Sequence, residues 1–122
     1  MDLELSERIV EGHAVVGLRG ELDLTSTDML RDRLFAILTE KSASLILDLS
    51  GLTFMDSTGI SVLVATERRA FALGGSLSLA GLQKVVARVL HVTSLDRHFP
   101  IFATVEDAVH AGCEPEPPVA AT

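Results

Sequence analysis

The chain has 122 residues, a length that predicts one domain and excludes a two-domain enzyme. Hydrophobic residues make up 48% of it and charged residues 22%, a composition that excludes a disordered chain and predicts one hydrophobic core. A formal net charge of -7 makes nucleic acid and anionic membrane surfaces unfavourable as direct partners.

Membrane, secretion and metal-binding signals are missing from the sequence. No segment approaches the roughly 20 consecutive apolar residues of a membrane-spanning helix, and the acidic start at residues 1–4 is unlike a signal peptide. We therefore expect a cytoplasmic protein. The single cysteine, Cys113, and four widely spaced histidines give no ligand motif, so we expect no metal and no cofactor.

The first half of the chain predicts two strands, a helix and a third strand. Apolar runs at residues 9–10 and 14–18, separated by a polar break, indicate a hairpin. Thr25 and Asp28 have the spacing of a capping box, and the apolar residues after them share one helical face: Leu30, Leu34, Ile37 and Leu38. Residues 45–49 form a nearly continuous apolar run, which is typical of a central strand covered on both faces.

The second half of the chain continues to alternate helices with strands. A helix is predicted from residues 56–57 to Gly74, with Ile60, Leu63, Val64 and Phe71 facing inward. Residues 76–80 alternate as a strand, and residues 82–91 predict a helix whose buried face holds Leu82, Val85, Val86, Val89 and Leu90. An edge strand at residues 99–102 and a final helix, with a cap spacing from Thr104 to Asp107, complete the series.

The order β-β-α-β-α-β-α-β-α predicts an α/β fold: a mixed sheet with an initial hairpin and crossover helices. One domain is expected over residues 1–112. Residues 113–122 hold three of the four prolines and no aromatic residue, so they are predicted to form a disordered tail.

Residues 55–60 (Met-Asp-Ser-Thr-Gly-Ile) combine small and polar residues where a strand gives way to a helix. One interpretation is a helix cap, in which Asp56 or Ser57 accepts a hydrogen bond from a free backbone amide. The other is a phosphoacceptor at Ser57, since free amides and the helix dipole favour an anion there. A phosphoryl group adds about -1.5 to -2 charges. Residues 1–66 already hold eleven acidic and five basic side chains, so such a site would act as a switch.

Catalytic alternatives lack their motifs. Met55 stands where a nucleophile elbow requires glycine, which argues against a serine hydrolase. The sequence has neither a dinucleotide fingerprint nor a phosphate-binding loop, so another protein must supply the phosphoryl group. Asp48 could suggest a phosphate-accepting receiver domain, but no acidic pair follows the first strand. We interpret it as a strand-end residue bonded to the following turn.

A second polar cluster, residues 20–27, has the composition of a turn followed by a helix cap. With this cluster the sequence resembles the anti-sigma factor antagonists, the single-domain branch of the STAS family. Three segments carry the resemblance: Gly20-Glu21-Leu22-Asp23, residues 45–49 followed by residues 54–60, and residues 99–108. Together they span nearly all of residues 3–111.

The resemblance implies a non-enzymatic regulatory domain. In its unphosphorylated form, such a domain binds an anti-sigma factor that is also a serine kinase, and so releases a sigma factor. Ser57 matches the phosphoacceptor, and a serine phosphatase would restore it. The expected partner-binding residues are Asp23, Thr25, Asp56, Ser57, Thr58 and Gly59. Thr58 stands where a second serine is common, which leaves open whether it is also modified.

We expect the protein to be a monomer when it is free. An alternative keeps the fold but makes the chain a scaffold or sensor subunit of a larger signalling complex. A stable high-order homo-oligomer would favour that alternative.

Overall fold

The computed structural model describes residues 3–112, so the predicted tail at residues 113–122 lies outside the described residues. The elements follow the predicted order and confirm the α/β fold. The strands are β1 (Leu3–Val10), β2 (His13–Leu22), β3 (Ser44–Met55), β4 (Ser76–Ala80) and β5 (Ile101–Phe102). The helices are α1 (Thr27–Glu40), α2 (Ser57–Ala72), α3 (Lys84–Val92) and α4 (Val105–Gly112), with a short 3-10 helix η1 (Leu95–Arg97).

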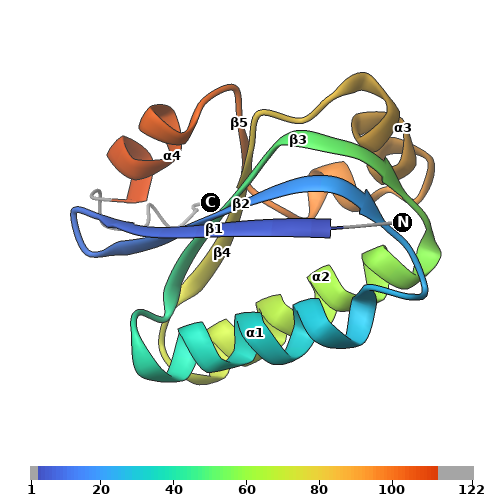
Figure 1. Cartoon of the computed structure of the whole chain (residues 1–122). Helices are drawn as coiled ribbons and strands as arrows, with labels where there is room; N and C mark the ends of the chain where they lie inside the picture. Colours follow the sequence, from blue (N-terminus) through green and yellow to red (C-terminus); the bar gives the residue numbers. More distant parts are fainter. Residues whose placement is uncertain (1–2, 113–122) are drawn as a thin grey trace.

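The five strands lie in the sheet in sequence order, from β1 at one edge to β5 at the other. The β1–β2 hairpin is antiparallel, and each later pair is parallel. Successive crossovers advance across the sheet in one direction, so right-handed connections place α1 and α2 on the same face. Figure 1 shows both helices below the sheet and α4 on the opposite side.

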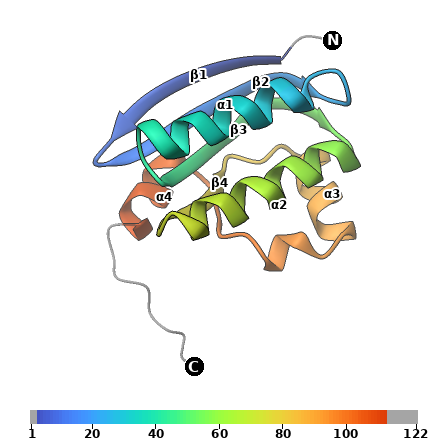
Figure 2. The same ribbon diagram turned by 90° about the horizontal axis from the view of Figure 1, so that it is seen from below.

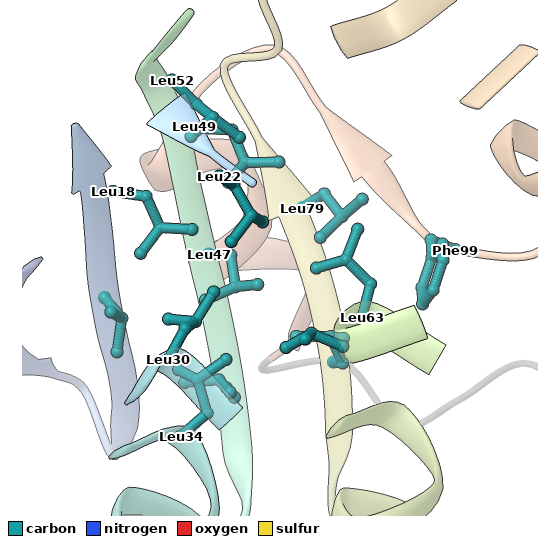
Figure 3. Packing of buried hydrophobic residues seen from close by; sticks show 14 of the residues in the cluster. Leu18, Leu22, Leu30, Leu34, Leu47, Leu49, Leu52, Leu63, Leu79 and Phe99 are labelled. Atoms are coloured by element: carbon teal, nitrogen blue, oxygen red, sulfur yellow. The ribbon is translucent and has the colours of Figure 1, made fainter. Parts of the chain in front are cut away.

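The core lies mainly between the sheet and these two helices. Leucines dominate it, and Figure 3 shows Leu18, Leu47 and Leu79 from three neighbouring strands meeting Leu30, Leu34 and Leu63 from the helices. A smaller cluster on the other face joins Val15, Ile46 and Ala80 to α4. Residues 45–49 therefore form a strand whose apolar residues are buried on both faces, as predicted.

Several boundaries differ from the sequence prediction. β3 runs on through Ser50 and Gly51 to Met55, because β2 continues beside it and supplies backbone partners to the end. Asp48 therefore lies within the strand, although its Oδ1 does accept a hydrogen bond from the Ser50 amide at 3.1 Å. The cap predicted at Thr104 is confirmed: its hydroxyl accepts a hydrogen bond from the Asp107 amide.

Two residues that the sequence places in the core are exposed, so this part of the prediction is wrong. Phe71 is 76% exposed and Val85 is 43% exposed, although both fit the apolar period of their helices. In α2 the buried side instead carries Val62, Leu63, Thr66 and Ala70. The helix is apolar over more of its circumference than the sheet covers, so periodicity alone could not tell which side faces solvent.

Replacing Leu47 with alanine should destabilise the fold by about 2–5 kcal/mol, because the fully buried side chain leaves a cavity at the centre of the sheet. Urea denaturation measures the change. Val92→Ala, at a side chain that is 74% exposed, is the control and should remain within about 0.5 kcal/mol of the parent. Equal stability of the two variants would contradict this description of the core.

Candidate functional site

The two polar clusters found in the sequence meet at one edge of the sheet. The parallel register of β2 and β3 pairs Leu22 with Met55, the last residue of each strand. The next residue along each strand is an aspartate, Asp23 after β2 and Asp56 after β3. Both turns lie at the right of Figure 1, where the chain enters α1 and α2.

Asp56 caps α2. Its Oδ1 accepts hydrogen bonds from the amides of Thr58 at 3.0 Å and Gly59 at 3.4 Å, and from the Thr58 hydroxyl. Two of the amides that open the helix are thus already bound by a carboxylate. The cap interpretation of this junction is correct for Asp56, and Ser57 is the first residue of the helix.

Asp23 repeats this geometry without capping a helix. Its Oδ1 accepts from the Thr25 amide at 3.0 Å and from the Thr25 hydroxyl at 2.7 Å. The capping box predicted for Thr25 and Asp28 is wrong: α1 begins at Thr27, and the Thr25 hydroxyl turns back to Asp23. The side chains of Asp23 and Asp56 therefore close two similar Asp-x-Thr turns next to each other.

Both carboxylates are stabilised in their charged form. The hydrogen bond from the Thr58 hydroxyl, helped by the Thr58 and Gly59 amides, lowers the pKa of Asp56 below its ordinary value. The Thr25 hydroxyl has the same effect on the pKa of Asp23. The negative charge of Asp23 acts in the opposite direction and raises the pKa of Asp56, but it is outweighed by the hydrogen bonds. This edge of the sheet therefore carries two anionic groups.

The middle residues of the two turns, Leu24 and Ser57, point to solvent. Leu24 is 73% exposed, and Ser57 is also exposed. Among the described residues, the Ser57 hydroxyl has no hydrogen-bond partner, whereas the Thr58 hydroxyl is bound to Asp56. The two hydroxyls of the Ser-Thr pair thus differ in availability.

Gly59, one of the partner-binding residues predicted from the sequence, is buried. A Cβ at this position would lie 2.6 Å from Met55 Cγ and 2.9 Å from Leu22 Cδ2. The missing side chain lets the first turn of α2 pack directly on the ends of β2 and β3. Gly59 therefore positions the first turn of α2 against the strand ends.

Sequence reasoning missed two members of this region. Leu24 lies within a predicted turn. Ser26 lies in the same segment, is buried, and its hydroxyl accepts a hydrogen bond from the Asp23 amide at 3.1 Å. The signal that could have found the pair of turns is the repeated Asp-x-Thr pattern at residues 23–25 and 56–58.

Residues 3–112 contain neither a membrane-spanning helix nor a cluster of metal ligands. None of the helices in this range is long and apolar enough to cross a membrane. In the same range, no three His, Cys, Asp or Glu side chains gather into a group that could hold a metal ion.

Comparison with known proteins assigns this chain to a family. The STAS domain family matches residues 4–108. The chain belongs to the STAS domain family. The anti-sigma-B factor antagonist of Bacillus subtilis (strain 168) is 33% identical over 109 residues, which is 89% of this chain and 99% of that protein.

Solved structures support this family assignment. An anti-sigma factor antagonist from Mycobacterium paratuberculosis superposes with a TM-score of 0.84 at 26% identity, covering 93% of this chain and 96% of that one. The anti-sigma factor antagonist SpoIIAA is similar in two forms. Its unphosphorylated form gives a TM-score of 0.76 at 25% identity over 90% and 95% of the two chains. Its phosphorylated form gives 0.68 at 24% identity over 90% and 98%, a likeness of fold.

The STAS family and fold predicted from the sequence are thus confirmed. The relatives are anti-sigma factor antagonists. This family assignment identifies a regulatory, non-enzymatic domain.

Acidification should reduce stability through the lowered pKa values of Asp23 and Asp56. Their hydrogen-bonded charged forms stabilise the fold above the ordinary aspartate pKa, and this contribution is lost as pH falls through the lower folded-state values. Asp56→Asn should therefore show a smaller loss of melting temperature than the parent between about pH 6 and pH 2.5.

The matched control is Glu106→Gln, an exposed carboxylate in α4 that has no hydrogen bond within the described residues. Its melting temperature should fall with pH as steeply as that of the parent. An Asp56→Asn variant with the parent's pH dependence would contradict the assigned cap.

Gly59→Ala should destabilise the protein despite alanine's better helix propensity. The propensity gain is about 1 kcal/mol, whereas crowding against Met55 and Leu22 should cost about 1–3 kcal/mol. Thermal unfolding monitored by circular dichroism measures the balance. Ser61→Ala, at an exposed position one turn from Ser57, is the control and should change stability little. A more stable Gly59→Ala protein would show that the assigned close packing is absent.

Proposed function

We propose that this chain is an anti-sigma factor antagonist that is switched by phosphorylation of Ser57. In the unphosphorylated state it binds an anti-sigma factor with serine kinase activity, and a sigma factor is released. The kinase inactivates it by phosphorylating Ser57, and a serine phosphatase restores it. The free protein is a cytoplasmic monomer, and it binds neither nucleic acid nor a membrane directly.

The observation that carries this proposal is the exposed Ser57 hydroxyl, which has no hydrogen-bond partner in the described part of the chain. A kinase can approach it without breaking a bond of the fold. The Thr58 hydroxyl is held by Asp56, so its modification would disrupt the helix cap. Of the two neighbouring hydroxyls, we therefore assign the modification to Ser57.

The effect of phosphorylation follows from the surrounding charges. A phosphoryl group adds about -1.5 to -2 charges next to Asp56 and close to Asp23, whose carboxylates are held in the charged form. The helix start offers little compensation, because Asp56 already occupies the amides of Thr58 and Gly59. The new charge is therefore directed toward the partner, while the fold around it is unchanged.

The contact surface of the unphosphorylated state consists of the two Asp-x-Thr turns. Asp23, Thr25, Asp56, Ser57 and Thr58 belong to it, and we add Leu24 because it is exposed in the middle of the first turn. Two carboxylates with an exposed leucine complement a partner surface that is basic around an apolar depression. Charge complementarity of this kind sets orientation and association rate.

Substitution of Ser57 tests the switch. Ser57→Ala should bind the anti-sigma factor of the source organism within about threefold of the parent, because it adds no charge. Ser57→Asp should bind at least about tenfold more weakly, since it brings a third negative charge to the contact. Isothermal titration calorimetry measures both Kd values. Thr39→Asp, at an exposed position near the other end of α1, adds the same charge and should bind like the parent.

Phosphorylation itself is tested by incubating the protein with ATP and the anti-sigma factor. Peptide mass spectrometry then locates any phosphoryl group. One phosphoryl group at Ser57, absent from Ser57→Ala, supports the proposal. If Ser57→Ala and Ser57→Asp bind equally, the switch is refuted. A stable high-order homo-oligomer that binds no anti-sigma factor would favour the scaffold or sensor alternative.

A further inference from the structure

The outward side of α2 carries an exposed stripe that begins at the candidate site. Ser57, Ser61, Val64, Arg68 and Phe71 recur every three or four residues, so they lie along one side of the helix. Four of them are exposed, whereas Val64 is half-buried and packs against the core. Phe71, at the far end, has the largest exposed fraction of the large apolar side chains in the described range. This stripe, hereafter the α2 stripe, contributes none of the fully buried residues of the core.

A groove lies on each side of the α2 stripe. The groove between α1 and α2, about 600 Å³ in volume, is lined by Phe35, Ile60 and Val64 among others. A second groove of about 430 Å³ lies between α2 and the segment leading to β5, with Phe71 and Leu95 in its lining. Val64 and Arg68 line both grooves. Figure 2 shows α2 lying between α1 and that segment. A ridge between two grooves is the surface onto which a helix packs.

The charges of this surface are positive, in contrast to the rest of the chain. Glu67, beside Arg68, is hydrogen-bonded to the His98 ring. The Arg69 guanidinium lies 5.5 Å from the centre of the Phe35 ring. Arg68 has no ion pair with any described residue. In a chain with a net charge of -7, two adjacent guanidinium groups beside apolar grooves favour an acidic, amphipathic segment of a partner, separate from the basic surface that faces Asp23 and Asp56.

We propose that the α2 stripe is a second part of the surface that binds the anti-sigma factor, and that it receives an amphipathic helix of that partner. Apolar side chains of the helix enter the grooves beside Val64 and Phe71, and a carboxylate pairs with Arg68. This inference rests on the proposed function, since it extends the same contact along the helix that starts at Ser57. The 16 residues of α2 span about 24 Å, enough for several turns of a docked helix.

A second copy of this chain fits the stripe less well. In a two-fold symmetric dimer the same patch faces itself, so Arg68 and Arg69 of one copy would approach those of the other. The net charge of -7 on each copy adds to this repulsion. Continuity with the Ser57 turn and complementarity to acidic side chains both point to the anti-sigma factor.

Two substitutions in the full chain test the α2 stripe. Phe71→Ser removes an apolar side chain that is 76% exposed, and Arg68→Glu reverses an unpaired charge, so neither should unfold the protein. Each should weaken binding of the anti-sigma factor about tenfold by calorimetry, the effect expected of a central interface residue. The loss with Arg68→Glu should shrink at high salt.

The matched controls lie on β1, away from α2. Ile9→Ser changes an apolar side chain that is 55% exposed, and Arg8→Glu reverses an exposed charge. Both should bind within about twofold of the parent. Thermal unfolding of all four variants confirms that each is folded before binding is compared.

The outcomes separate this inference from the proposed function. Suppose that the parent binds and Ser57→Asp weakens binding, while Phe71→Ser and Arg68→Glu bind like the parent. The inference about the α2 stripe is then wrong, and the proposed function is retained. If no anti-sigma factor binds the parent, both are overturned. If the parent dimerises in sedimentation and Phe71→Ser alone abolishes the dimer, the stripe is a contact between copies, and the inference is wrong.

Discussion

The parallel pairing of β2 with β3 controls the position of every residue in the candidate site. Its register brings Leu22 and Met55 together at the strand ends, and each strand then turns at an aspartate. Residues 33 positions apart in sequence therefore act as one surface. A shift of one residue would turn the apolar side chains of β3 away from α1 and α2, so burial of those side chains also fixes the site.

Holding two carboxylates side by side carries an electrostatic cost, and the local hydrogen bonds offset it. Each aspartate accepts an amide and a hydroxyl from the threonine two residues later. These bonds are internal to each turn and do not involve Ser57. The hydrogen bonds that cap α2 are therefore complete within the chain itself. Under the proposed function, phosphorylation of Ser57 would add charge at this position without requiring a new cap.

Much of this arrangement was predictable from the sequence. The element order, the cap at residue 56 and the candidate phosphoacceptor follow from local patterns, because apolar period and side-chain type decide them. The adjacency of Asp23 and Asp56 depends on which strands pair, which local patterns do not contain. The orientation of Phe71 was predicted wrongly because α2 is apolar on several sides, and only the sheet decides which side is covered. Gly59 shows its role only through the atoms around it.

The division between buried and exposed residues has an evolutionary consequence. Leu24 and Phe71 are prominent on the surface yet contribute little to the core, whereas Gly59, Leu22 and Met55 hold the strand ends and helix together. Substitutions at the first pair therefore cost little folding stability. Under the proposed function, a copy of this domain that arises by gene duplication can change its choice of partner at those positions while keeping the same scaffold and the same serine. Sister pathways in one cell can become insulated from each other in this way.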